Sequence, residues 1–227
     1  MDGAVAIVLA AGSGERLGLD RPKAFVELAG RPMLVHAVAA ALDCPGISAV
    51  VVAAPPGAED LAHAIVEPFG SHAVVEGGST RRASVRAALE AVPGDVALVV
   101  VHDAARPFAT SGLFGRVLEQ LAGVDGVVPV VPVPDTVKRV DNGMVVTTEP
   151  RDGLVLAQTP QAFLAIALRE AHERAERDDV EVTDDAMALE RAGFRVRAIA
   201  GEPGNFKITT AEDLARAEAV ALELARG

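Results

Sequence analysis

The 227-residue sequence has a single cysteine, Cys44, and contains neither tryptophan nor tyrosine. One cysteine excludes an intrachain disulfide and a zinc site built from cysteines. Seven phenylalanines are the only large aromatic residues, so the chain offers little for stacking nucleobases.

Positive charge is also scarce, because 21 basic residues face 32 acidic ones and the formal net charge is −11. Sequence-independent binding of nucleic acid needs lysine and arginine against the phosphates, and docking on an anionic membrane needs a basic surface. No hydrophobic run is long enough to span a bilayer, and the apolar run 4–11 starts too early and ends too soon for a secretory signal. We therefore expect a cytoplasmic globular protein with no nucleic-acid partner and no membrane contact.

Lysine itself is rare, since only three of the 21 basic residues are lysine: Lys23, Lys138 and Lys207. Codon bias explains this pattern in one interpretation. In the other, lysine is retained where a compact ammonium is needed instead of a planar guanidinium. All three lysines lie in segments that are singled out below.

Short, nearly continuous apolar runs alternate with segments of helical periodicity through the first two thirds of the chain. The expected strands are 4–9, 47–53, 72–76, 96–101 and 126–131, and the expected helices are 32–42, 58–68, 81–92 and 112–121. Such runs are typical of strands that are covered on both faces, and their alternation with helices indicates right-handed crossovers. The pattern predicts an α/β fold with a Rossmann-like, doubly wound, mostly parallel sheet.

The pattern changes between residues 129 and 159, where prolines accumulate and Asn142-Gly143 separates two β-prone runs. Asn-Gly at such a position predicts a β-hairpin. We expect a single domain, 1–227, from which residues 132–157 project as a β-hairpin arm. The exposed strand edges of such an arm favour pairing with another subunit.

The remaining elements are predicted from capping signals. Thr159-Pro160 has the form of an N-cap and first helical residue, for a helix that continues to about Arg177. A short helix at 184–192, a strand at 195–200 and a last helix at 209–225 follow, and Thr209 with Glu212 forms a capping box.

The loop after the first strand is rich in small residues: Ala10, Ala11, Gly12, Ser13 and Gly14. It fails the dinucleotide fingerprint, because the third glycine is one position late and the second strand lacks the acidic residue that binds a ribose. It also lacks the Gly-Lys-Ser/Thr of a Walker loop. Two cations follow the glycines, Arg16 and Lys23, and suit a triphosphate whose leaving pyrophosphate gains charge. The alternative is a tight turn with surface bases.

Three further segments lie at the same predicted edge of the sheet. Residues 77–84 combine glycines, hydroxyls and arginines at a helix start, which suits an anion; a capped helix with solvated arginines is the alternative. Asp103 follows the fourth strand, at the carboxyl end of the sheet, and is a candidate Mg²⁺ ligand, or else pairs with Arg106 to stabilise the turn. Lys207 precedes the last helix and is a candidate site residue; the alternative is a helix cap in which the lysine has no function. We expect His102 to be structural.

In this order the segments resemble the 2-C-methyl-D-erythritol 4-phosphate cytidylyltransferase family of the non-mevalonate isoprenoid pathway, over essentially the whole chain. The resemblance is carried by these motifs: Ala10-Ala11-Gly12 with Gly14 and Arg16, Pro22-Lys23, Gly78 with Arg81 and Ser84, His102 through Pro107, Asp135 through Lys138, Arg151, Thr159-Pro160-Gln161, Thr183 through Ala186, and Lys207.

The resemblance implies a homodimeric, CTP-dependent transferase that uses Mg²⁺. A sugar-alcohol phosphate attacks the α-phosphate of CTP, which gives 4-diphosphocytidyl-2-C-methyl-D-erythritol and pyrophosphate. The implied catalytic residues are Arg16, Lys23, Arg151 from the neighbouring subunit, and Lys207. The implied nucleotide-binding residues are Ala10, Ala11, Gly12, Gly14, Gly78, Ser79, Arg81 and Ser84. The implied residues at the methylerythritol phosphate are Asp103, Arg106, Thr136 and Thr159.

One departure from the family pattern concerns Ser79, where relatives often carry an acidic residue, so the contact made at this position stays open. The alternatives to this function are a cytidylyltransferase for ribitol phosphate or another alditol phosphate, and a non-catalytic nucleotide-binding subunit. An NAD-dependent oxidoreductase ranks below both, because the dinucleotide fingerprint fails.

Overall fold

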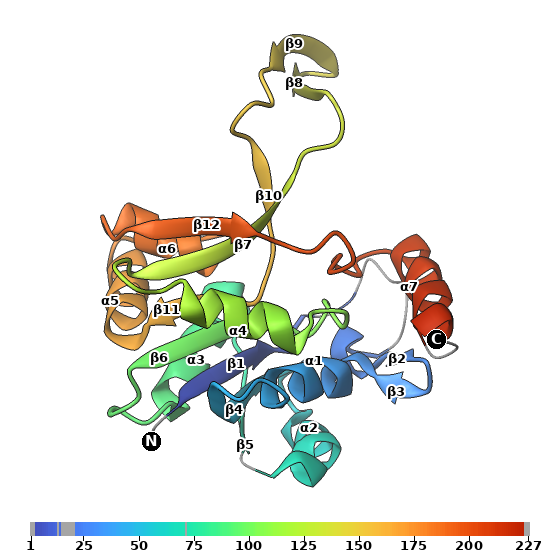
Figure 1. Ribbon diagram of the computed structural model, residues 1–227, viewed down its shortest axis with the longest axis vertical. Coiled ribbons are helices and arrows are strands. Elements are labelled where there is room, and N and C mark those ends of the chain that lie inside the picture. Colours follow the sequence, from blue (N-terminus) through green and yellow to red (C-terminus); the bar gives the residue numbers. More distant parts are fainter. Residues whose placement is uncertain (1–2, 13, 15–20, 71, 225–227) are drawn as a thin grey trace.

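The central element is an eight-stranded sheet, and its order is β10-β7-β11-β6-β1-β4-β5, with β12 paired to β7 (Figure 1). A computed structural model describes residues 3–12, 14, 21–70 and 72–224. The strands are β1 (Ala4–Leu9), β4 (Ile47–Ala54), β5 (His72–Glu76), β6 (Leu98–Asp103), β7 (Gly126–Pro132), β10 (Val155–Ala157), β11 (Gln161–Leu164) and β12 (Val196–Ala200).

Strand β1 lies in the middle and pairs in parallel with β4 on one side and β6 on the other. Strand β5 extends the parallel set beyond β4, and β12 runs parallel to β7. The predicted mostly parallel sheet is therefore confirmed. Because the strand order reverses around β1, a crevice forms at the carboxyl ends of the strands there, and this is where open α/β sheets bind ligands.

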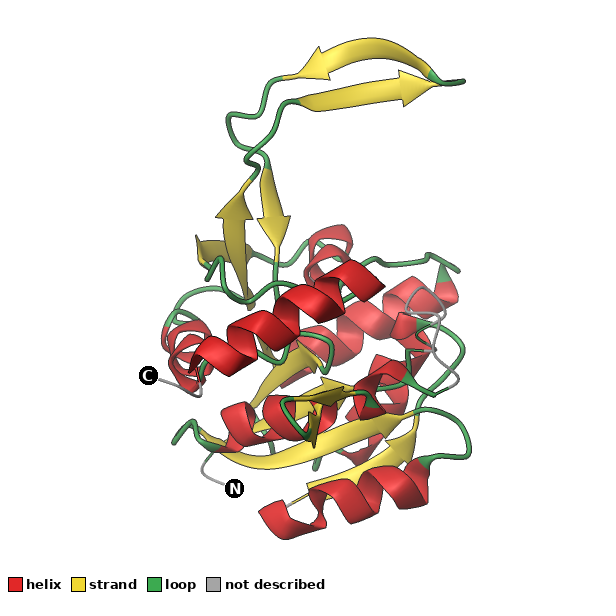
Figure 2. Cartoon of the chain, turned by 90° about the vertical axis from the view of Figure 1, so that its right-hand side faces the viewer, coloured by secondary structure: helices red, strands yellow, loops and turns green. Residues whose placement is uncertain are grey.

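Helices cover both faces of the sheet (Figures 1 and 2). The helices are α1 (Met33–Leu42), α2 (Glu59–Val66), α3 (Arg81–Ala91), α4 (Ser111–Glu119), α5 (Ala165–Arg177), α6 (Asp185–Arg191) and α7 (Ala211–Leu224). Alternate residues of β1 enter opposite cores, as the pleat requires. Ala6 and Val8 pack in the core that contains α1, α2 and α4, whereas Val5 and Ile7 pack in the core that contains α3, α5 and α6.

The predicted helix from Pro160 is wrong at its beginning. The segment Gln161–Leu164 is strand β11, which pairs antiparallel with both β6 and β7, and α5 begins only at Ala165. The side chain of Phe163 is completely buried in this strand. The local signal of Thr159-Pro160 is thus overridden by tertiary pairing, which fills the gap between two strands.

The capping box of α7 is displaced by one residue from the predicted one. Thr210 Oγ1 accepts a hydrogen bond from Asp213 N at 3.2 Å, and Asp213 Oδ2 accepts from Thr210 N at 2.9 Å. This reciprocal pair defines Thr210, and not Thr209, as the N-cap. The predicted capping box of Thr209 and Glu212 is therefore wrong by one residue.

A third, smaller core joins α7 to the segment that follows the first loop. It contains Val26, Leu28, Met33, Ile208 and Ala217. The segment includes the 3₁₀ turn η2 (Lys23–Phe25) and the short pair β2 (Glu27–Leu28) and β3 (Arg31–Pro32). A second 3₁₀ turn, η3 (Glu67–Phe69), follows α2. The third core brings residues 26–33 and 208–221 together beside the crevice.

The hairpin of β8 (Val137–Asp141) and β9 (Met144–Glu149) extends away from the sheet (Figure 1). Asn142 and Gly143 both have positive φ, at 47° and 79°, as the predicted Asn-Gly turn requires. Met144, Val145 and Val146 are 60–72% exposed. Lys138 donates to Thr148 within the hairpin, and so this lysine lies away from the crevice.

No helix in the described part of the chain is long and apolar enough to cross a membrane.

Candidate active site

A cavity of about 770 Å³ lies at the carboxyl ends of the parallel strands. Loops after β1, β4, β5 and β6 line it, together with η2 and the segment before α7. The lining residues are Leu9, Ala10, Ala11, Gly12, Gly14, Lys23, Ala24, Pro56, Gly78, Ser79, Thr80, Arg81, Ser84, Asp103, Ala105, Lys207 and Thr209. The cavity therefore contains all eight residues that the resemblance places at the nucleotide.

Two glycines allow the loop after β5 to approach its neighbours closely. A Cβ on Gly77 would lie 2.4 Å from the Cβ of Ala11, and a Cβ on Gly78 would lie 2.3 Å from the Cβ of Ala83. Helix α3 then begins with Thr80 as its N-cap, whose hydroxyl accepts from Ala83 N at 3.1 Å. The positive end of this helix dipole thus faces the cavity wall, which suits a bound anion.

Lys23 and Lys207 converge on this cavity although they are far apart in sequence. Lys23 is in η2, and Lys207 precedes the buried Ile208 of the third core. The backbone hydrogen bond from Ile208 N to Ala105 O, at 2.9 Å, ties the second lysine to the loop after β6. Gly14 has a φ of +77° and lies against Lys23, where a Cβ would be 3.0 Å from the lysine Cβ.

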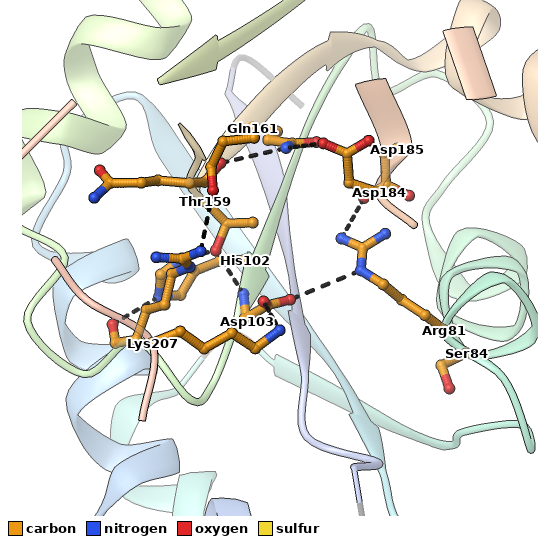
Figure 3. Close-up of polar contacts among 12 residues, drawn as sticks. Arg81, Ser84, His102, Asp103, Thr159, Gln161, Asp184, Asp185 and Lys207 are labelled. Carbon is orange, nitrogen blue, oxygen red and sulfur yellow. Dashed lines mark hydrogen bonds and ion pairs between the residues drawn. The ribbon is translucent and has the colours of Figure 1, made fainter. Parts of the chain in front are cut away.

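Asp103 lies between two cations of the cavity (Figure 3). Its Oδ2 is 2.7 Å from Lys207 Nζ, and its Oδ1 is 3.8 Å from Arg81 Nε. Burial opposes ionisation of this carboxyl, but Lys207 and Arg81 outweigh burial and hold the pKa of Asp103 well below its usual range. Asp103 is therefore an anion that orders the cations around it.

His102 and Thr159 form a buried support beneath Asp103. The Thr159 hydroxyl lies 3.1 Å from His102 Nδ1 and accepts a hydrogen bond from Asp103 N at 3.0 Å. His102 Nε2 lies 3.2 Å from the carbonyl oxygen of Arg106. Burial lowers the pKa of His102 to about 4, so the imidazole is neutral at pH 7, in agreement with a structural role. Thr159 is 4% exposed and does not line the cavity.

Arg106 also lies outside the cavity lining. Its guanidinium donates to Asn205 O at 2.9 Å and to Ala157 O at 3.2 Å, which joins the loop after β6 to the segment before α7 and to β10. Thr136 and Arg151 are exposed in the arm, in the two segments that flank the β8–β9 hairpin, and Arg151 donates to Pro134 O at 2.9 Å. Within this chain, the structure does not bring these three residues into the cavity. Arg16 lies outside the described residues.

The described residues do not fit a preformed Mg²⁺ site. They contain no group of three His, Cys, Asp or Glu side chains that could hold a metal ion. Asp103, the one predicted ligand, already faces Lys207 and Arg81 through its two oxygens. A hard dication at this carboxylate would therefore compete with two fixed positive charges.

Some residues of the site were missed by the sequence reasoning. Pro56 and Thr209 line the cavity, and their positions after β4 and before α7 are the signal that could have found them. Asp185 was part of a recognised motif without a role. Its carboxylate is 2.7 Å from Arg81 Nη2, a contact between residues 104 positions apart that no local pattern reveals.

The arrangement is suited to a multiply charged anion. Lys23, Arg81 and Lys207 supply positive charge, the start of α3 supplies backbone donors, and the glycine-rich loops let a ligand reach the backbone. A protein of net charge −11 can still have a positive local field where cations gather on one cavity wall. Among the described residues, the cavity lining contains no His, Cys or Glu, and its one carboxylate, Asp103, is paired with Lys207 and Arg81.

The whole chain is similar to known proteins. Residues 4–223 match the family model of 2-C-methyl-D-erythritol 4-phosphate cytidylyltransferase. A relative of that name from Rhodococcus jostii is 48% identical over 221 residues, which is 96% of this chain and 95% of the relative. The crystal structure of the Thermus thermophilus cytidylyltransferase has a TM-score of 0.81 and 41% identity, with 98% of this chain and all of that chain covered. The structure of 4-diphosphocytidyl-2C-methyl-D-erythritol synthase from Anaerococcus prevotii has a TM-score of 0.86 and 31% identity, with 97% and 99% covered. The chain therefore belongs to the 2-C-methyl-D-erythritol 4-phosphate cytidylyltransferase family.

Proposed function

We propose that this protein transfers the cytidylyl group of CTP to 2-C-methyl-D-erythritol 4-phosphate. The observation that carries the proposal is the convergence of Lys23, Arg81 and Lys207 on one cavity at the carboxyl ends of the strands. Membership of the family supports the choice of nucleotide and acceptor.

In the proposed reaction a phosphate oxygen of the acceptor attacks the α-phosphorus of CTP. A new P–O bond forms, the bond between the α-phosphorus and the bridging oxygen breaks, and pyrophosphate leaves with the electron pair. The attacking phosphate monoester is already anionic at neutral pH, so no residue has to remove a proton. The protein's task is to bring two anions together, align them and stabilise the charge of the transition state.

The predicted cations and small residues have distinct parts in this scheme. Lys23, with Arg16, would stabilise the pentavalent transition state and the leaving pyrophosphate, and the small residues after β1 would admit the nucleotide. Lys207, held by Asp103 at 2.7 Å, would meet the phosphate of the acceptor. Because Asp103 fixes the ammonium before the substrate arrives, little reorganisation is needed during the reaction.

Magnesium enters this proposal as part of the nucleotide substrate. Mg²⁺ is typically bound through substrate phosphates and keeps several waters, which agrees with a cavity whose lining is cationic. Removal of Mg²⁺ with a chelator should abolish turnover, and added Mg²⁺ should restore it. Full turnover of metal-free CTP would contradict this part of the proposal.

We further propose a homodimer in which the arm of one subunit supplies Arg151 and Thr136 to the site of the other. Thr136 and Arg151 are exposed and do not line the cavity of their own chain, and this, with the exposed apolar residues of the arm, supports the arrangement. A mixture of Arg151→Ala and Asp103→Ala subunits should regain activity, since one site of each heterodimer then keeps both residues. No recovery after verified subunit exchange would place the site within one chain.

The decisive test is CTP-dependent release of pyrophosphate with a panel of alditol phosphates. The proposal expects release with 2-C-methyl-D-erythritol 4-phosphate at a higher kcat/KM than with ribitol phosphate. A preference for ribitol phosphate would change the acceptor. Binding of CTP without turnover on any acceptor would indicate a non-catalytic nucleotide-binding subunit.

A further inference from the structure

Asp185, the first residue of α6, has a completely buried carboxylate to which the proposed reaction assigns no part. Its Oδ2 accepts a hydrogen bond from Arg81 Nη2 at 2.7 Å, and its Oδ1 lies 2.9 Å from His172 Nε2 of α5. Because Arg81 and His172 outweigh the cost of burial and lower the pKa of Asp185 to about 2, the carboxylate is ionised. His172 Nε2 must then be the donor.

Stability alone is a poor explanation for this buried pair. The cost of removing two charges from water offsets most of their attraction, so apolar residues of similar volume usually serve as well. Helices α3 and α5 are also joined without Asp185. Arg82 of α3 donates to Ala175 O at 2.8 Å, and Arg169 of α5 donates to Leu89 O at 2.7 Å.

The other end of the contact is a cavity residue. Arg81 lines the cavity with 20% of its side chain exposed, and its Nε lies 3.8 Å from Asp103 (Figure 3). Its Nη1 is buried and has no hydrogen-bond partner among the described residues. The guanidinium therefore has a donor that no described protein group uses. An arginine can be held by one edge of its planar fork while the other donors remain available.

Among the described residues, the other carboxylate that pairs with Arg81 is that of Asp103, which already holds Lys207 at 2.7 Å. Without Asp185, the guanidinium would be drawn toward Asp103 and would compete with Lys207 for its oxygens. The carboxylate of Asp185 thus holds Arg81 apart from the pair formed by Asp103 and Lys207, and the cavity retains separate cations.

We propose that Asp185, supported by His172, is a positioning residue that fixes the guanidinium of Arg81 for contact with the nucleotide. This inference rests on the proposed function, in which Arg81 binds CTP. Asp185 itself touches no substrate, because its side chain is completely buried.

The first test is a double-mutant cycle on kcat/KM for CTP, with Asp185→Asn, Arg81→Met and the double variant. Asp185→Asn should lower kcat/KM between about 10- and 100-fold, the scale expected when a binding group is misplaced by about 1 Å. In the Arg81→Met background the same change should cost less than about twofold, since the group that it positions is gone. Unchanged kcat/KM in Asp185→Asn, or losses that multiply in the double variant, would overturn the proposal.

A matched control is Asp184→Asn, which removes the same charge from the preceding residue. Asp184 accepts from Met187 N at 2.9 Å and from Gln161 Nε2 at 2.9 Å, and asparagine can still cap the helix. This variant should keep kcat/KM for CTP within about threefold of the wild type. A loss equal to that of Asp185→Asn would mean that charge alone, and not the anchor, is responsible.

A second readout does not depend on activity. In protein labelled with ¹⁵N-arginine, the Nε–H signal that disappears in Arg81→Met reports the anchored guanidinium. It should shift or broaden in Asp185→Asn and stay in place in Asp184→Asn and in His172→Gln, whose amide can still donate. An unchanged signal in Asp185→Asn would overturn the anchor. If the anchor is confirmed but the wild type releases no pyrophosphate, the proposed function fails by itself.

Discussion

Acidification from pH 7 to pH 4 should destabilise this protein through His102. The imidazole is completely buried, and burial lowers its pKa from the usual 6.5 to about 4 in the folded state. Between these two values the unfolded chain binds a proton that the folded chain does not. The free energy of unfolding must therefore fall as the pH falls across this window.

The size of the effect follows from the two pKa values of His102. At about 1.4 kcal/mol per pKa unit, the stability lost through this one group amounts to about 2 kcal/mol at pH 5 and about 3 kcal/mol at pH 4. Domains typically have a total stability of about 5–15 kcal/mol, so the loss is large enough to measure. Asp103 and Asp185, whose pKa values are lowered, add their own losses only below about pH 4.

Urea unfolding at several pH values between 7 and 4.5 measures this loss, with His102→Gln as the comparison. Glutamine cannot titrate, so the variant is expected to be less stable at pH 7 but to lose less stability on acidification. The difference between the two slopes isolates His102 from other titrating groups. If wild type and variant lose stability in parallel between pH 7 and pH 5, the reasoning is refuted.

Two further predictions concern the cavity. Lys23→Ala and Arg16→Ala should each lower kcat by about 100-fold or more, as removal of one preorganised donor does elsewhere, while the circular dichroism spectrum stays unchanged; near-normal turnover in a pyrophosphate-release assay would contradict the assignment. Gly77→Ala should raise the KM for CTP and lower the free energy of unfolding by about 1–3 kcal/mol, because the new Cβ would lie 2.4 Å from the Cβ of Ala11. A melting temperature equal to that of the wild type would show that the two loops can separate freely.

Local patterns were sufficient to predict most of the fold. Residues 4–9 and 126–131 form β1 (Ala4–Leu9) and β7 (Gly126–Pro132), because short apolar runs rich in valine and isoleucine are typical of strands covered on both faces. The Asn-Gly hairpin was predictable because the positive φ values at Asn142 and Gly143 demand such residues. Strand β11 was not, since its strand character comes from partners about 35 and 60 residues earlier in the chain.

The candidate site was also predictable only in part. The loops after β1, β5 and β6 could be placed at one edge because parallel strands end together, and their residues do line one cavity. The partners of the charged groups could not be predicted. Asp103 could pair with Arg106 by proximity in sequence, yet it contacts Lys207 and Arg81, while Arg106 donates to Asn205 O and Ala157 O.

The position of Lys207 shows why such pairings escape sequence reasoning. The lysine reaches the cavity because Ile208 is buried in the small core beneath α7, and because Ile208 N donates to Ala105 O beside Asp103. That core also contains Val26, three residues after Lys23, so one set of apolar contacts places both lysines. A substitution that loosens this core, such as Ile208→Ala, should therefore impair both cationic positions at once, although Ile208 does not line the cavity. If Ile208→Ala changed the position of only one lysine, the segments that contain Lys23 and Lys207 would each have to hold their conformation independently. The contacts of Ile208 argue against that.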